Sequence, residues 1–168
     1  MNSKRKCCDV TSMCGLNLWQ GVIFVGTSTI VICSLIFIIS AVTLGHMVSE
    51  TENQYNKNPV LAINILFVLY SSCISSYQIV ISALLVWHAL KHIKDGVFFC
   101  TLWYVSHLSI LSLYCFLFSA RTIITFNAKQ YFSAIVTVVC AAVYKALFIY
   151  FSVVVNSYLH SLEAERYV

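Results

Sequence analysis

The chain has 168 residues, of which 60% are hydrophobic and only 10% are charged, and its mean hydropathy is +0.86. Soluble domains carry about 25% charged residues and about 45–50% apolar ones. This composition excludes a soluble one-domain enzyme. The formal net charge of +4 comes from scattered residues, so it gives no indication of nucleic-acid binding and instead suits a surface that faces anionic lipid.

Four long apolar segments follow one another along the chain. Each exceeds the roughly 20 residues that a helix needs to cross a bilayer, and unbroken helices satisfy the backbone groups that lipid cannot. The single proline, Pro59, precedes the second segment, where its missing N–H is not needed. We therefore predict an all-α fold, an integral membrane four-helix bundle that residues 1–168 form as one domain. The predicted spans are residues 19–44, 60–90, 97–120 and 131–159.

The distribution of lysine and arginine predicts the orientation, because short loops rich in these residues stay in the cytosol. The side of the termini carries Lys4, Arg5, Lys6, Lys91, Lys94 and Arg166, and the other side carries Lys57, Lys129 and Arg121. Both termini are therefore predicted to be cytosolic, with residues 51–58 outside. The first span reads as an uncleaved signal anchor, since it is too long for a signal peptide. We expect Trp19, Trp87 and Trp103 to anchor the cytosolic interface.

The eight cysteines predict no disulfide framework in this topology. Cys7, Cys8 and Cys14 lie on the predicted cytosolic side, where thiols stay reduced. Cys7 and Cys8 form a pair beside a basic cluster near the membrane, which is typical of S-palmitoylated cysteines; an unmodified pair is the alternative. The other five cysteines fall in or at the edges of the spans, and we expect them to pack as small apolar residues. They are Cys33, Cys73, Cys100, Cys115 and Cys140.

Small and polar residues recur at helical spacing in every span. In lipid, such stripes bring helices together through close approach and shared hydrogen bonds. They therefore predict packing within one compact bundle, and the alternative is a polar conduit along its axis. The stripes are Thr29, Cys33, Ser40 and Thr43; Asn64, Ser71, Ser75, Gln78 and Ser82; Ser109, Ser112 and Ser119; and Thr137, Ala141, Lys145, Ser152 and Asn156.

Lys145 is the one charged residue near the middle of a span. Ionised lysine there is unfavourable by about 2.5–3.5 kcal/mol, and all six acidic residues fall outside the spans. Lys145 could be neutral, reach the interface, or contact Asn64, Ser or Tyr oxygens or an acid of another chain. We favour a structural or partner contact over an ion or substrate site. His107 could relay protons, but a hydrogen-bonded packing histidine is favoured, and Gln78 belongs to the polar stripe of its span.

Catalytic patterns are missing from the sequence. It has no nucleophile elbow, zinc-protease helix or phosphate-binding glycine loop, and its serines have no positioned base. We therefore predict that the protein is not an enzyme and uses no metal or cofactor.

Two stretches resemble small four-span proteins. They are residues 7–30, CCDVTSMCGLNLWQGVIFVGTSTI, and residues 150–162, YFSVVVNSYLHSL. The combination of a cysteine cluster before the first span with an apolar fourth span and a short polar tail resembles the insect family that includes the pasiflora proteins of septate junctions. It is more distantly similar to four-span proteins of the LAPTM and MARVEL types. The resemblance implies a role in assembling occluding junctions.

The sequence thus predicts a non-enzymatic membrane protein that acts in the assembly or trafficking of membrane complexes. Its expected partners are lipid and other membrane proteins, bound through helix–helix contacts that include self-association, and not nucleic acid. The lateral plasma membrane is the favoured location, with endolysosomal membrane as the alternative. The rival hypothesis is a small transporter or channel subunit that uses Lys145 and His107.

Overall fold

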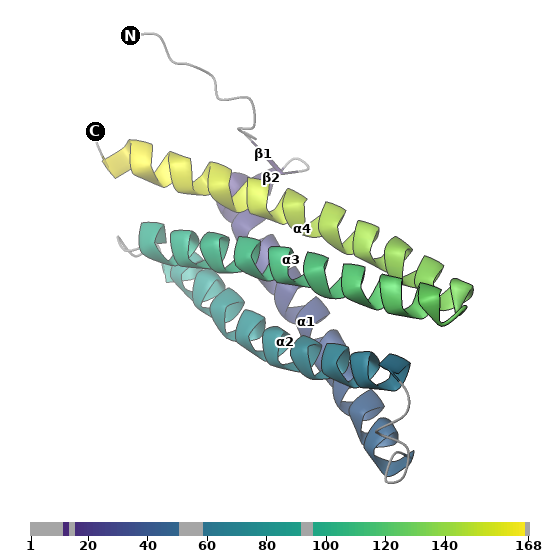
Figure 1. Cartoon of the computed structure of the whole chain (residues 1–168). Coiled ribbons are helices and arrows are strands. Elements are labelled where there is room, and N and C mark those ends of the chain that lie inside the picture. The colour runs from purple at the N-terminus through teal and green to yellow at the C-terminus, as the bar shows by residue number, and fades with distance from the viewer. Residues whose placement is uncertain (1–11, 14–15, 51–58, 92–95, 167–168) are drawn as a thin grey trace.

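The computed structural model describes residues 12–13, 16–50, 59–91 and 96–166. Within these ranges the chain forms four long helices, α1 (Leu18–Glu50), α2 (Pro59–Lys91), α3 (Gly96–Asn127) and α4 (Tyr131–Arg166). All four are long and apolar enough to cross a membrane, and they lie together as one bundle (Figure 1). The predicted all-α membrane fold is confirmed. Each predicted span lies within one of these helices.

A short antiparallel ladder precedes α1 and was not predicted. Strands β1 (Ser12–Met13) and β2 (Leu16–Asn17) pair with Ser12 opposite Asn17 and Met13 opposite Leu16. Helix α1 starts directly after β2. The backbone N–H of Asn17 donates to Oε1 of Gln20, at 3.3 Å, which is one half of the capping box that stabilises a helix start.

The connection from α3 to α4 is a tight turn. The N–H of Gln130 donates to the carbonyl of Thr125 and the N–H of Lys129 to that of Phe126, each at 2.9 Å. This pair of bonds is the Schellman arrangement, which requires a left-handed residue after the helix. Lys129 takes that conformation, with φ of 60°. The turn therefore sets α3 and α4 side by side as antiparallel neighbours.

The start of α1, the end of α2, the start of α3 and the end of α4 share one end of the bundle, which we call the termini end; the other is the turn end (Figure 1). The main core lies toward the termini end, and Val22, Leu85 and Phe148 are among its fully buried members. Trp19 fixes the start of α1 there, because its Nε1 donates to the carbonyl of Ala89 at 2.8 Å. Which side of the membrane this end faces stays a prediction.

The helices separate toward the turn end. Helix α1 starts beside α4 and finishes at the lower edge of the view, close to α2 and far from α4 (Figure 1). A smaller cluster of Ile110, Tyr114 and Leu117, with Phe67 and Ile74 packed against it, is the core in this half. The bundle is therefore closed at the termini end and partly open at the turn end.

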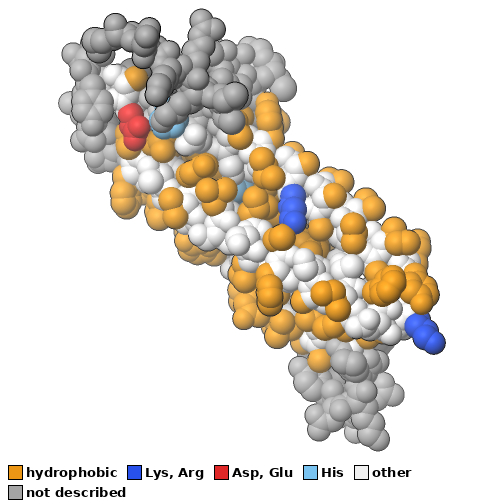
Figure 2. Space-filling view, turned by 45° about the horizontal axis from the view of Figure 1, so that its top comes forward, with side chains coloured by type: hydrophobic (Ala, Val, Ile, Leu, Met, Phe, Trp, Pro, Cys, Tyr) orange, Lys and Arg blue, Asp and Glu red, His pale blue; other side chains and the backbone are white. Residues whose placement is uncertain are grey.

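Apolar side chains are spread over the described helices on the face shown in Figure 2. Phe132, Phe116 and Phe98 are 83%, 71% and 63% exposed, as expected where lipid replaces water. The prediction that all five span cysteines pack inside is wrong for Cys73 and Cys140, which are exposed. A thiol is apolar enough to face lipid chains without a hydrogen-bond partner.

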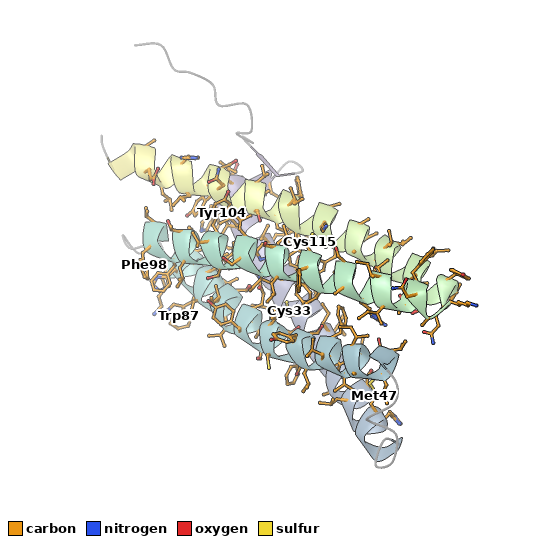
Figure 3. All side chains as sticks on the ribbon, viewed as in Figure 1. Cys33, Met47, Trp87, Phe98, Tyr104 and Cys115 are labelled. Carbon is orange, nitrogen blue, oxygen red and sulfur yellow. The ribbon has the colours of Figure 1, made fainter. Side chains whose placement is uncertain are left out.

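The tryptophans differ in position: Trp87 lies on the surface, whereas Trp103 lies in the core. Trp87 is 56% exposed near the end of α2, and Nζ of Lys91 lies 4.1 Å from its ring centre. Trp87 and Phe98 both point outward at the termini end (Figure 3). Trp103, by contrast, is fully buried, so its prediction as an interfacial anchor is wrong. Its indole N–H has a partner inside the bundle and does not need the interface.

Three of the four predicted polar stripes face the interior. Thr29, Ser75, Ser82 and Thr137 are among the buried members. The stripe predicted for the third span is wrong: Ser109, Ser112 and Ser119 are all exposed. Ser109 and Ser119 donate their hydroxyls to carbonyls one turn back, at 2.9 and 2.8 Å. This local bond lets a serine face lipid without an unpaired donor.

Helices α1 and α2 approach each other closely at Gly26. A Cβ there would overlap Cγ2 of Val86 and lie 3.5 Å from the carbonyl oxygen of Ser82, whereas a Cβ at Gly45 would meet nothing within 4 Å. We expect Gly26→Ala to lower stability by about 1–3 kcal/mol, because overpacking forces the helices apart. The thermal unfolding midpoint in detergent micelles measures this.

Gly45→Ala is the matched control in the same helix. It should leave the midpoint unchanged or raise it, because alanine has the higher helix propensity. Equal effects of the two substitutions would contradict the close approach at Gly26.

Candidate functional site

The structure brings Gln78 and His107 together inside the bundle. The amide Nε2 of Gln78 donates to Nδ1 of His107, and both residues are buried. One turn away, Nε1 of Trp103 donates to Oγ of Ser82 at 3.0 Å. These two bonds join α2 to α3 and set their antiparallel register.

Aromatic rings enclose His107 on both faces. The Trp103 ring lies 4.4 Å from the imidazole between centroids, with an interplanar angle of 8°, and the Phe148 ring lies 4.9 Å away at 22°. The imidazole is only 1% exposed. This environment suits a packing histidine, and its role stays a prediction.

The sequence contains a signal for these two bonds between α2 and α3. Gln78 and Ser82 are four residues apart on α2, and Trp103 and His107 are four apart on α3. Residues at this spacing share a helix face, and two antiparallel helices can pair them in reverse order. The pairing with Trp103 was missed because tryptophan was assigned to the interface.

Lys145 lies at a different place, in a groove between α3 and α4. Its Nζ donates to Sγ of Cys115 at 2.9 Å, and the side chain is half-buried. Cys115 lies on α3 in the half of the helix nearer the turn end (Figure 3). The contact with Asn64, one of the alternatives open for Lys145, is not formed: Asn64 lines a separate cavity. No ion pair to Lys145 is found among the described side chains.

The groove around Lys145 has a volume of about 440 Å³. Small residues form much of both walls of the groove, and Lys145 is the one charged residue among those that line it. The lining residues are Cys115, Phe118, Ser119, Thr122 and Ile123 of α3, and Val138, Ala141, Ala142 and Lys145 of α4.

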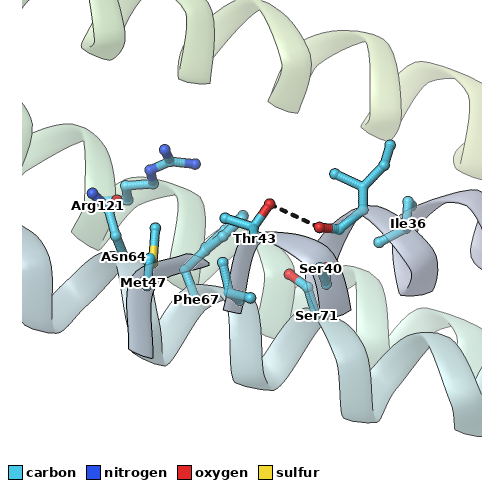
Figure 4. A pocket seen from close by; sticks show the side chains of 10 residues that line it. Ile36, Ser40, Thr43, Met47, Asn64, Phe67, Ser71 and Arg121 are labelled. Carbon is cyan, nitrogen blue, oxygen red and sulfur yellow. Dashed lines mark hydrogen bonds between the residues drawn. The ribbon is translucent and has the colours of Figure 1, made fainter. Parts of the chain in front are cut away.

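Asn64 lines a cavity of about 350 Å³ at the turn end, together with Arg121. The two side chains lie next to each other at one end of the cavity, and Ile36 lies at the other (Figure 4). Cζ of Arg121 is 4.9 Å from the Phe67 ring centre. Oδ1 of Asn64 and Nε of Arg121 are buried and have no hydrogen-bond partner within the described part of the chain. From the sequence, Arg121 was counted only among the charges that set the orientation, and this cavity was not predicted.

The four predicted contact residues therefore occupy three environments. Gln78 and His107 form one pair, whereas Lys145 and Asn64 each lie elsewhere. Across the described residues there is no group of three or more His, Cys, Asp or Glu side chains that could hold a metal ion. The predicted lipidation pair, Cys7 and Cys8, lies outside the described residues.

Comparison with protein-family models, with curated proteins and with solved structures gives no match. The resemblance to the pasiflora family, and to LAPTM and MARVEL proteins, therefore stays a prediction.

The Gln78–His107 pair predicts a specific pattern of stabilities. Gln78→Leu or His107→Phe alone leaves a buried polar group unpaired, and each should lower stability by about 1–2 kcal/mol. The double variant should be destabilised by less than the sum of the two, because both polar groups are gone and the ring at position 107 still stacks. Unfolding midpoints of the four proteins measure this, and additive losses would contradict direct pairing.

Proposed function

We propose that this protein is a non-enzymatic four-span membrane protein that assembles or sorts membrane complexes by binding a partner's transmembrane helix in the groove between α3 and α4. The observation that carries the proposal is the position of Lys145, a half-buried basic residue that lines a groove on the apolar surface.

The walls of the groove favour a helix as the occupant. Ser119 and Thr122 on α3 and Ala141 and Ala142 on α4 are small, and small residues let helix backbones approach closely in lipid. A neighbouring helix would also cover the exposed side chains beside the groove.

The charge of Lys145 favours an acidic or strongly polar group on that helix. Its contact with Cys115 is a weak one, since a neutral thiol is a poor acceptor. A carboxylate from another chain would neutralise the lysine where an isolated charge is unfavourable by about 2.5–3.5 kcal/mol.

The resemblance to septate-junction proteins supports a setting for this activity. It implies that the partners are components of occluding junctions in the lateral plasma membrane. Trafficking through endolysosomal membranes is the alternative setting, and it requires the same lateral contact. Acylation of Cys7 and Cys8 would add a membrane anchor to the predicted cytosolic segment.

Removing the charge should weaken the partner contact without preventing insertion. We expect Lys145→Leu to reduce co-purification of junction components from epithelial membranes about fivefold, the equivalent of about 1 kcal/mol for one interhelical bond. Lys129→Leu removes the same charge from the turn outside the groove and should have no effect. Unchanged co-purification by Lys145→Leu would refute the proposal.

Filling the groove tests the same contact without changing a charge. Ala142 lines the groove, whereas Ala83 is exposed on α2 away from it. Ala142→Phe should reduce partner binding at least as much as Lys145→Leu, and Ala83→Phe should not. Ion flux through purified protein in liposomes that Lys145→Leu abolishes would overturn the proposal in favour of a transporter or channel subunit.

Localisation tests the junction setting separately. A protein tagged within residues 51–58 should stain unpermeabilised polarised epithelium in a lateral ring that coincides with the occluding junction. Intracellular puncta alone would contradict this setting and favour trafficking.

A further inference from the structure

The cavity at the turn end has the composition of a site for an anion with an apolar tail. One wall carries Arg121, and no carboxylate is found among the described lining residues. Ser40, Thr43 and Asn64 add polar atoms from α1 and α2, while Ile36 and Val68 are among the apolar ones. We infer that this cavity binds the phosphate of an anionic phospholipid through Arg121 and Asn64, with an acyl chain on its apolar wall.

The guanidinium of Arg121 packs against a ring, and its Nε has no hydrogen-bond partner among the described residues. Phe67 lies against it, with 4.9 Å between Cζ and the ring centre, and Phe118 packs edge-on to Phe67 at 5.3 Å. Nε of Arg121 is buried and unpaired in the described part of the protein. A positioned arginine of this kind matches the geometry of a phosphate, which can accept two parallel N–H bonds.

Asn64 supplies the complementary group. Its Oδ1 is also buried without a partner among the described residues, and it lies beside Arg121 in Figure 4. This oxygen can accept a hydrogen bond from a headgroup hydroxyl, while the amide N–H groups can donate to a phosphate oxygen. The pair therefore offers donors and an acceptor to a glycerol-bearing phosphodiester.

The depth of the cavity matches a lipid headgroup. The helices contain 32 to 36 residues, about 48–54 Å at 1.5 Å per residue, against a hydrocarbon core of about 30 Å. Each helix therefore extends about 10 Å past the core if it is centred. Arg121 lies six residues before the end of α3 and Asn64 five after the start of α2, about 8–9 Å from those ends.

The cavity has a polar end and an apolar end, and the polar end is the one nearer the helix ends. Arg121 and Asn64 lie at one end of the cavity and Ile36 lies at the other (Figure 4). Asn64 is five residues from the start of α2, whereas Ile36 is near the middle of α1. A phospholipid inserted from the side would place its phosphate and its chain in this order. A free phosphate ion would use the polar end alone.

Binding of short-chain lipid to the purified full-length protein tests the site. Native mass spectrometry in detergent should show dioctanoyl phosphatidylglycerol bound about tenfold more tightly than dioctanoyl phosphatidylcholine. Arg121→Gln should lower the phosphatidylglycerol affinity about tenfold, the usual effect of losing a charge-assisted bond. Lys129→Gln, which removes a charge outside the cavity, should leave it unchanged.

A second pair of variants keeps the arginine. Ile39 lines the cavity and is 64% exposed, whereas its neighbour Ile38 is 57% exposed and does not line it. Ile39→Trp should block lipid binding, and Ile38→Trp should not. Equal binding of the two lipids, or full affinity in Arg121→Gln and Ile39→Trp, would overturn the proposal. Inorganic phosphate that binds as tightly as phosphatidylglycerol would also overturn it and assign the site to a free anion.

Discussion

The spans of this protein lie in a medium that neither donates nor accepts hydrogen bonds, so a polar group inside them is stabilised by a partner within the chain. Thr29 and Ser152 solve this locally and donate to the carbonyls of Val25 and Phe148, one turn back. Gln78 bonds across to His107 on the next helix. Because each cross-bond fits only one register, satisfying these groups also fixes how α2 and α3 pair.

Tight packing is confined to part of the bundle. At the termini end, Gly26 lets α1 meet α2 closely, and Trp103 and Phe148 fill the centre around His107. Toward the turn end α1 leaves α4, and a cavity and a groove form. The bundle therefore joins a tightly packed half to a more open one.

The two openings share an electrostatic property. Each contains one basic side chain, Lys145 or Arg121, and no carboxylate among its described lining residues. Their depths differ: Lys145 lies about 20 Å along α4 from its start, whereas Arg121 lies about 9 Å from the end of α3. The deeper basic side chain therefore suits an acid on another helix, and the shallower one suits a lipid phosphate. The two proposals therefore assign the two openings to different ligands.

The sequence alone determined the number and place of the spans, since only long apolar runs with few or no charges cross a bilayer. It also identified the inward faces of α1, α2 and α4, where polar residues recur every three or four positions. It failed for α3, whose serines face outward while Trp103 and His107 face inward. In lipid both faces of a helix can be apolar, so hydropathy does not distinguish them and a serine can satisfy itself on either face. Only the tertiary structure, through the contacts between helices, decided which side of α3 is inside, that Lys145 meets Cys115, and that Arg121 joins Asn64 in one cavity.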